Sequence, residues 1–113
     1  MHELSIISSI VGIAEEHVQK AGARQVDSIE LEIGELAGVD WSALDFAWEV
    51  GVQRSVLEGA ERQVDRIAGE AQCAECENVF LMKALFDPCP VCGSYFNEIK
   101  KGKELRVKAL TVS

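Results

Sequence analysis

Four cysteines constrain this chain most, because they form two Cys-x-x-Cys pairs and account for all of its cysteine. Cys73 and Cys76 make the first pair, and Cys89 and Cys92 make the second. Each pair can direct two thiolates at one ion, and the stretch between the pairs is long enough to fold back as a hairpin. This spacing is typical of a tetrahedral zinc site. With four protein ligands the metal has no open position, so zinc here would be structural.

Two other interpretations of the cysteines stay open, namely an iron site of the rubredoxin type and a pair of disulfides. Disulfides are typical of exported proteins. The chain begins Met1-His2-Glu3 without the features of a secretory signal, and no apolar run is long enough to span a bilayer. We therefore expect a cytoplasmic protein with reduced cysteines and no membrane partner.

The turns that follow the two cysteine pairs differ in one residue. Gly93 follows the second pair, where glycine lets the backbone turn tightly and direct N–H groups at the sulfurs. The corresponding residue after the first pair is Glu77. We expect the first turn to be less favourable than the second.

Length and charge limit the class of protein. A chain of 113 residues supports one modest domain with a small lobe attached. Its formal net charge is −8 at pH 7, and such a surface repels phosphate backbones. We expect cationic partners or metal ions and no nucleic acid.

The first half of the chain has clear periodicity. Residues 4–21 carry an apolar stripe at three- and four-residue steps and predict a helix that Gly22 ends. The stripe consists of Leu4, Ile7, Ile10, Val11, Ala14, Val18 and Ala21. Residues 26–34 alternate apolar and polar side chains and predict a half-buried strand. Asp40 is placed to cap a second helix, from Trp41 to about residue 53.

The second half has weaker signals. Residues 59–68 predict a strand with a diluted pattern, and residues 79–86 predict a strand within the cysteine lobe. Residues 95–99 could pair back against that strand. Residues 103–112 predict a last strand, with Leu105, Val107 and Ala109 on one face.

The order of these elements predicts an α+β fold. We expect a small mixed three-stranded sheet covered by two helices, with the four-cysteine zinc lobe inserted between the last two strands of the sheet. Residues 1–69 plus 102–113 would form the α/β domain, and residues 70–101 would form the zinc-binding lobe.

The amino terminus offers a different kind of metal site. A single histidine at a terminus is usually solvated, yet the Met1 amine, the backbone and ring nitrogens of His2 and the amide nitrogen of Glu3 can surround one ion in a plane. Square-planar nitrogen ligands suit Ni(II) or Cu(II) and do not suit zinc.

These features and several internal motifs together resemble the HypA/HybF family of hydrogenase nickel-incorporation chaperones. The motifs that carry the resemblance are Met1-His2-Glu3-Leu4, Ile33-Gly34-Glu35-Leu36, Leu44-Asp45-Phe46-Ala47-Trp48-Glu49-Val50, Glu58-Gly59-Ala60, the four cysteines, and Gly102-Lys103-Glu104-Leu105. They span essentially the whole chain in one order.

The resemblance implies a nickel metallochaperone that is not an enzyme. It would carry Ni²⁺ as transient cargo to the large subunit of [NiFe]-hydrogenase, together with a HypB-type GTPase, as a monomer or homodimer. His2 would be the nickel ligand, with Met1 and Glu3 beside it. The α/β domain would then bind nickel, and the cysteines would hold structural Zn²⁺.

Two alternatives belong to other functional classes. The first is a zinc-ribbon module that binds nucleic acid, but residues 73–100 hold four acidic and two basic side chains, whereas such modules normally carry a basic stripe. The second is a structural adaptor in which His2 is incidental. An enzyme is disfavoured because the two histidines lie far apart in sequence and no activated nucleophile is evident.

Overall fold

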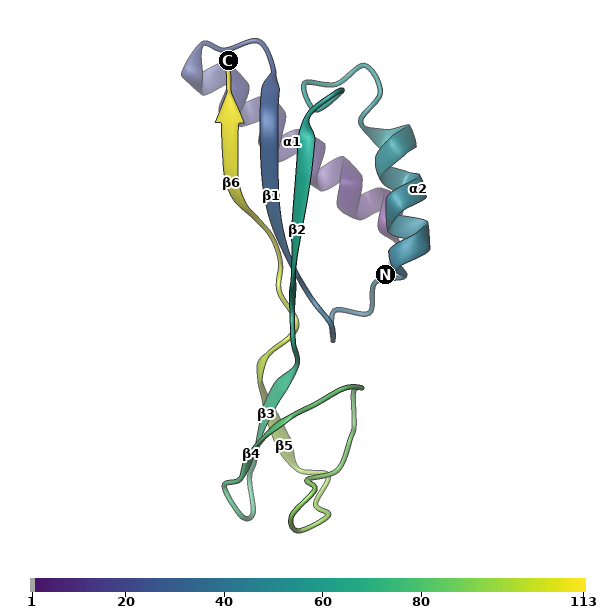
Figure 1. Cartoon of the computed structure of the whole chain (residues 1–113), viewed down its shortest axis with the longest axis vertical. Helices are drawn as coiled ribbons and strands as arrows, with labels where there is room; N and C mark the ends of the chain where they lie inside the picture. The colour runs from purple at the N-terminus through teal and green to yellow at the C-terminus, as the bar shows by residue number, and fades with distance from the viewer. Residues whose placement is uncertain (1) are drawn as a thin grey trace. The chain divides into compact units, whose positions relative to one another are not determined.

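The computed structural model describes residues 2–113, and Met1 lies outside the described residues. Figure 1 shows the elements in order. The helices are α1 (Glu3–Ala21) and α2 (Trp41–Gly51), and the strands are β1 (Val26–Gly34), β2 (Glu61–Ile67), β3 (Glu70–Cys73), β4 (Val79–Leu81), β5 (Asn97–Lys101) and β6 (Leu105–Val112). The predicted α+β fold is confirmed: two helices and a three-stranded mixed sheet are accompanied by a separate small sheet with the four-cysteine cluster.

Helix α1 follows from its apolar stripe and its glycine stop. The residues that it buries are Ile6, Ile7, Ile10, Ala14 and Val18. Gly22 adopts a left-handed conformation (φ 65°), and its N–H and that of Ala23 donate to carbonyls of the last turn. The predicted apolar stripe is confirmed in the central turns of the helix. It is wrong at Leu4 and Ala21, which are exposed because they lie at the two ends of the helix.

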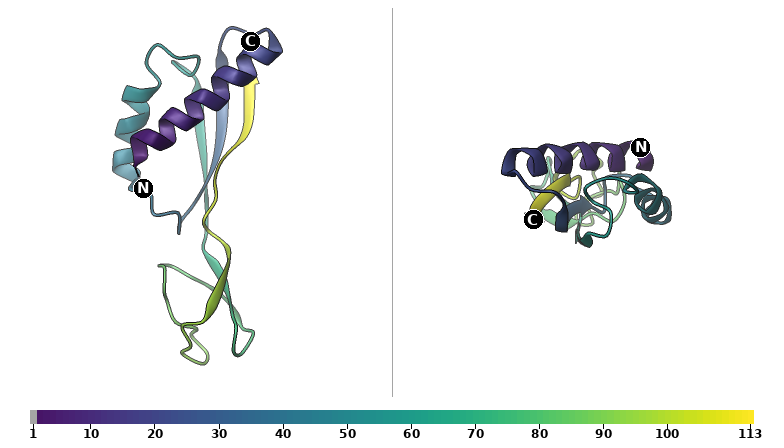
Figure 2. Two further views of the ribbon diagram at one scale, coloured as in Figure 1. Left: turned by 180° about the vertical axis from the view of Figure 1, so that it is seen from behind. Right: turned by 90° about the horizontal axis from the view of Figure 1, so that it is seen from above.

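The larger sheet has the strand order β2-β1-β6. Alternation along β1 buries Ile29, Leu31 and Ile33, while Glu30 faces the other way and pairs with Lys108 at 3.4 Å. Figure 2 shows α1 lying across one face of this sheet. The apolar face of β1 and the stripe of α1 therefore supply a common core.

Backbone hydrogen bonds at the ends of β1 give the strand directions. The residues before β1 bond to the end of β6 and the last residue of β1 bonds to the start of β6, so β1 and β6 are antiparallel. The N–H of Val26 donates to Val56 at 2.9 Å and that of Glu35 donates to Ile67 at 2.8 Å, so β2 runs parallel to β1. The sheet is mixed, as predicted.

Asp40 caps α2 as predicted, because its carboxylate accepts the N–H of Ala43 at 3.1 Å. The helix buries Leu44, Ala47 and Trp48. It ends at Gly51, two residues earlier than expected, and at this point it lies against Ile7 of α1.

The weak pattern of β2 has a local explanation. The guanidinium of Arg62 lies 5.1 Å from the centre of the Trp48 ring and pairs with Asp45 at 3.0 Å. These contacts hold an arginine at a half-buried position of the strand, and so the apolar alternation is interrupted there. In β6 the alternation shifts part-way along: Leu105 and Val107 are half-buried as expected, but Ala109 is exposed.

The chain forms two compact units. Unit 1 comprises Met1–Leu31, Val39–Val64 and Arg106–Ser113, and unit 2 comprises Glu32–Gly38 and Asp65–Leu105. Within residues 2–113, neither helix has the length and apolar character needed to cross a membrane.

Unit 2 contains the small sheet, with the strand order β4-β3-β5. Both neighbours pair antiparallel with β3, which the sequence pattern did not predict as a strand. The expectation that residues 95–99 pair with residues 79–86 is therefore wrong, because β3 lies between them. One face of this sheet packs a small core made of Leu36, Ala71, Met82, Phe80 and Ile99.

Strand β4 is also shorter than the predicted strand of residues 79–86. The carboxylate of Asp87 accepts the N–H groups of Lys83 and Ala84 at 3.1 and 3.0 Å, so the chain turns directly after Met82. These local bonds replace the ladder bonds that a longer strand would need.

Candidate metal centre

The first cysteine pair sits on a tight turn that leaves β3. The N–H of Cys73 donates to the carbonyl of Asn78 at 2.9 Å, and the carbonyl of Cys73 accepts the N–H of Glu77 at 3.0 Å. The turn brings the N–H of Cys76 to 3.5 Å from the sulfur of Cys73. Glu77 adopts φ 66°, a left-handed conformation that L-residues rarely adopt.

The second pair has the same arrangement of backbone hydrogen bonds, in which the N–H of the first cysteine bonds to the carbonyl five residues later. The N–H of Cys89 donates to the carbonyl of Ser94, and the carbonyl of Cys89 accepts the N–H of Gly93, both at 2.8 Å. Gly93 has φ 76°, close to that of Glu77. The two turns therefore have the same backbone conformation, but only the second has glycine at the left-handed position. The expectation that the first turn is the less favourable stays a prediction, which stability measurements can test.

The four sulfurs form one cluster. They all lie within 4.8 Å of one another, and the contacts Cys73–Cys92 and Cys76–Cys89 measure 3.5 and 3.6 Å between sulfurs. A tetrahedral zinc ion with Zn–S bonds of about 2.3 Å requires sulfurs roughly 3.8 Å apart. The cluster and its thiolate chemistry thus fit zinc. All four cysteines are free, so the disulfide alternative is wrong.

Backbone N–H groups favour the thiolate at the first cysteine of each pair. The N–H of Cys76 lowers the pKa of Cys73, and the N–H of Cys92 lowers the pKa of Cys89 to about 6. At Cys92 the N–H of Ser94 also favours the thiolate, but the neighbouring thiols and burial together raise its pKa to about 12. Four adjacent thiolates repel one another, and a divalent cation would remove that repulsion.

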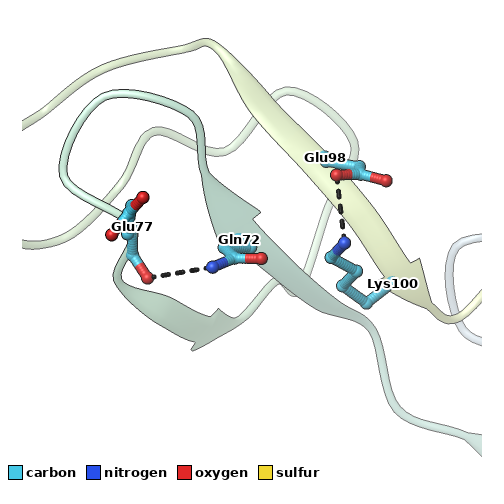
Figure 3. Close-up of polar contacts among 4 residues, drawn as sticks. All are labelled: Gln72, Glu77, Glu98 and Lys100. Carbon is cyan, nitrogen blue, oxygen red and sulfur yellow. Dashed lines mark hydrogen bonds and ion pairs between the residues drawn. The ribbon is translucent and has the colours of Figure 1, made fainter.

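Two further side chains contact the cysteine turns. Figure 3 shows the amide of Gln72 reaching the carbonyl of Glu77, at 3.4 Å, and a neighbouring ion pair of 3.0 Å between Glu98 and Lys100 on β5. The amide of Asn78 points at the sulfur of Cys89 from 3.9 Å. The contact of Gln72 follows from the pairing of β3 with β4, and that of Asn78 follows from the meeting of the two cysteine turns.

The amino-terminal residues belong to unit 1. His2 is exposed and precedes α1, and within residues 2–113 its side chain makes no capping hydrogen bond. The carboxylate of Glu3 lies 3.4 Å from the backbone nitrogen of Asp40. The four cysteines are the one group of three or more potential ligand side chains that the described residues bring together, so His2 and Glu3 do not form such a group there.

His17 lies near the other end of α1. It is exposed, and its Nδ1–H donates to the carbonyl of Ile13 at 3.0 Å. Fifteen positions of helix separate it from His2, or roughly 20 Å at 1.5 Å per residue, so the two rings cannot bind one ion within a chain.

Comparison with known proteins decides the family. Residues 1–112 match the family model described as hydrogenase/urease nickel incorporation, metallochaperone, HypA. The chain belongs to the HypA family. It is 51% identical to the hydrogenase maturation factor HypA of Parabacteroides distasonis, an alignment that covers 99% of this chain and 97% of that protein. It is 43% identical to the HypA protein of Geobacter metallireducens, with 99% of each chain covered.

A solved structure has a similar fold. The solution structure of the Ni metallochaperone HypA from Helicobacter pylori aligns with a TM-score of 0.70 and 32% sequence identity, over 99% of this chain and 97% of that chain. The resemblance inferred from sequence motifs is thus confirmed. This HypA family member is a nickel metallochaperone of hydrogenase maturation and not an enzyme, and the machinery of that process supplies its partners.

Proposed function

We propose that this protein binds Ni²⁺ at its amino terminus and delivers it as transient cargo to the large subunit of [NiFe]-hydrogenase. His2 would be the principal ligand, and the Met1 amine and Glu3 would complete the site beside it. The observation that carries the proposal is an exposed imidazole at the second residue of a HypA family chain. Planar nitrogen ligands of this kind suit Ni(II) or Cu(II) and do not suit zinc, and the family points to nickel.

The structure gives this proposal local support. The ring of His2 is exposed and makes no capping bond in the described part of the chain, so it is free to bind an ion. The contact of Glu3 with Asp40 holds the first turn of α1 next to the start of α2. A terminus fixed at this point would present His2 from a rigid helix rather than from a loose tail.

Zinc in the cysteine cluster would have a separate, structural role. Cys73, Cys76, Cys89 and Cys92 would hold one Zn²⁺ with no open coordination position, so the ion would maintain the lobe and would not carry cargo. On this view residues 1–69 plus 102–113 form the nickel-binding domain and residues 70–101 form the zinc-binding lobe. Iron bound by the same four cysteines is the alternative, and metal analysis of the purified protein would distinguish it from zinc.

Delivery would take place in the cytoplasm with a HypB-type GTPase. Relatives named hydrogenase maturation factor HypA support hydrogenase as the destination. The protein would act as a monomer or homodimer.

The direct test is nickel binding by untagged protein, its His2→Ala variant and its His17→Ala variant. We expect about one tightly bound nickel ion per chain in the native and His17→Ala proteins and loss of that ion in His2→Ala, because only His2 is adjacent to the terminal amine. Zinc content should stay at about one per chain in all three proteins. Loss of nickel from His17→Ala, or its retention in His2→Ala, would contradict the proposed ligands.

A further inference from the structure

Each cysteine turn positions its own two sulfurs through local backbone bonds, but these bonds do not relate one pair of cysteines to the other. In both turns the bonds run between the first cysteine and the residues four and five positions later. A tetrahedral four-thiolate site also requires the two pairs to stand at the correct separation. The contacts that set this separation come from residues that reach both turns.

Asn97, the first residue of β5, reaches both turns. Its backbone is the register partner of Cys73, the last residue of β3. The contact continues at Phe96, whose carbonyl accepts the N–H of Ala74 at 2.8 Å. Figure 3 shows β5 lying beside β3 close to the first turn. The start of β5 is therefore attached to the first cysteine pair.

The side chain of Asn97 holds the second pair. Its amide nitrogen donates to the carbonyl of Asp87 at 3.2 Å and to that of Ser94 at 3.0 Å. Asp87 lies two residues before Cys89, and Ser94 lies two residues after Cys92, so these bonds join the ends of the segment that carries the second pair. The Ser94 carbonyl also accepts the N–H of Cys89 at 2.8 Å. The amide of Asn97 thus shares its acceptor with a bond that shapes the second turn.

The oxygen of the same amide indicates which property of Asn97 the fold uses. Its Oδ1 is buried, and within residues 2–113 it accepts no hydrogen bond. A buried acceptor without a partner costs free energy, so the lobe gains nothing from this oxygen. The two amide donors are what distinguish Asn97 from an apolar side chain of the same shape.

We propose that Asn97 is a positioning residue of the metal centre, which sets the second cysteine pair against the first through its two amide donors. Cys73 and Cys89, the two cysteines that it relates, are each only 1% exposed, so this connection lies on the buried side of the cluster. Side chains that orient metal ligands contribute to affinity although they do not touch the ion. The proposal rests on the zinc site in the cysteine cluster and not on where nickel binds.

Two variants remove the donors in different ways. Asn97→Leu keeps the branched shape and is neutral, whereas Asn97→Asp keeps Oδ1 and adds a negative charge. The zinc affinity of the full-length protein, measured by competition with a chromophoric chelator, should fall roughly 10–100-fold in both variants. Agreement between the two variants excludes the added charge as the cause.

Ile99→Val is the matched control. Ile99 lies on the same strand as Asn97 and packs against the small core of unit 2. Because metal binding is coupled to folding of the lobe, this change should also weaken zinc binding, but by less than about tenfold.

Hydrogen exchange of the zinc-loaded proteins separates positioning from a general loss of stability. In Asn97→Leu the N–H groups of Cys89 and Gly93 should exchange at least about tenfold faster than in the native protein, while that of Glu77 in the first turn should change little. In Ile99→Val any faster exchange should be shared equally by the two turns.

Zinc affinity of Asn97→Leu within about twofold of the native value would overturn the proposal, as would equally faster exchange in both turns of that variant. A native protein that binds no zinc would instead contradict the zinc site itself. If neither variant folds with zinc, Asn97→Ser decides, because its hydroxyl keeps one shorter donor. Zinc affinity below the native value, with faster exchange confined to the second turn, would support the proposal, and native affinity would overturn it.

Discussion

At the scale of single residues, the two cysteine turns form a matched pair that differs at one position. A left-handed L-residue costs about 1–2 kcal/mol, and glycine loses roughly 0.5–1 kcal/mol of chain entropy in folding. Glu77→Gly should therefore raise the free energy of unfolding of the zinc-loaded lobe by up to about 1 kcal/mol, measured by urea denaturation. Gly93→Ala is the matched control and should lower it by a similar amount, since an added Cβ meets no atom within 4 Å and only the strain remains. If Glu77→Gly lowered the free energy of unfolding, the left-handed conformation of Glu77 would not be a source of strain in the first cysteine turn.

At the scale of elements, contact between the helices can be tested with two helical glycines. A Cβ at Gly51 in α2 would lie 2.6 Å from Cγ2 of Ile7 in α1, whereas a Cβ at Gly12 in α1 would meet nothing within 4 Å. Gly51→Ala should lower the free energy of unfolding of unit 1 by about 1–3 kcal/mol through overpacking. Gly12→Ala should raise it by roughly 0.5–1 kcal/mol through helix propensity. Thermal denaturation by circular dichroism distinguishes the two outcomes, and equal stabilisation by both changes would refute the close approach of the helices.

The capping of α2 gives a second test at this scale. Asp40→Ala removes the oxygen that accepts the N–H of Ala43 and should cost about 1 kcal/mol of stability. Asp40→Asn keeps an acceptor oxygen and should cost much less. Urea denaturation measures both, and an equal loss in the two variants would show that the charge of Asp40, rather than its cap, matters.

At the scale of the whole molecule, the two units should respond differently to metal removal. Unit 2 has only a small apolar core around Leu36, Ala71 and Met82, whereas unit 1 buries both helix stripes and most of β1. Removing zinc with a chelator, or replacing Cys89 with serine, should abolish hydrogen-exchange protection in β3, β4 and β5 because metal binding supplies their folding free energy. Protection in α1 should persist. Protected β3 amides without metal would show that the lobe folds on its own core.

The difference between interactions that are local along the chain and those that are distant explains which features of the fold the sequence could predict. Helix α1, strand β1 and the Asp40 cap depend on periodicity and on neighbours along the chain, and each was predicted with the correct bounds or nearly so. Strand β3 alternates polar and buried apolar residues but has only four residues, too few to stand out as a pattern, and it becomes a strand because β4 and β5 pair with it from both sides. The cysteine cluster was predictable from spacing alone, whereas the contact of Gln72 with the first turn depends on that unpredicted pairing and the contact of Asn78 with Cys89 depends on how the two turns meet.

The central claim is that nickel binds through the amine of Met1 and the nitrogens of His2, and its most direct test is X-ray absorption spectroscopy of Ni(II) on two proteins. One begins at Met1 and the other has a single glycine before Met1, which converts the amine to an amide and leaves every described element unchanged. We predict planar four-nitrogen nickel in the first protein, and weaker six-coordinate nickel with oxygen ligands in the second, at equal zinc content. Identical affinity and identical spectra in the two proteins would contradict the account, and His2 would then need other partners, with Glu3 and Asp40 the first to examine.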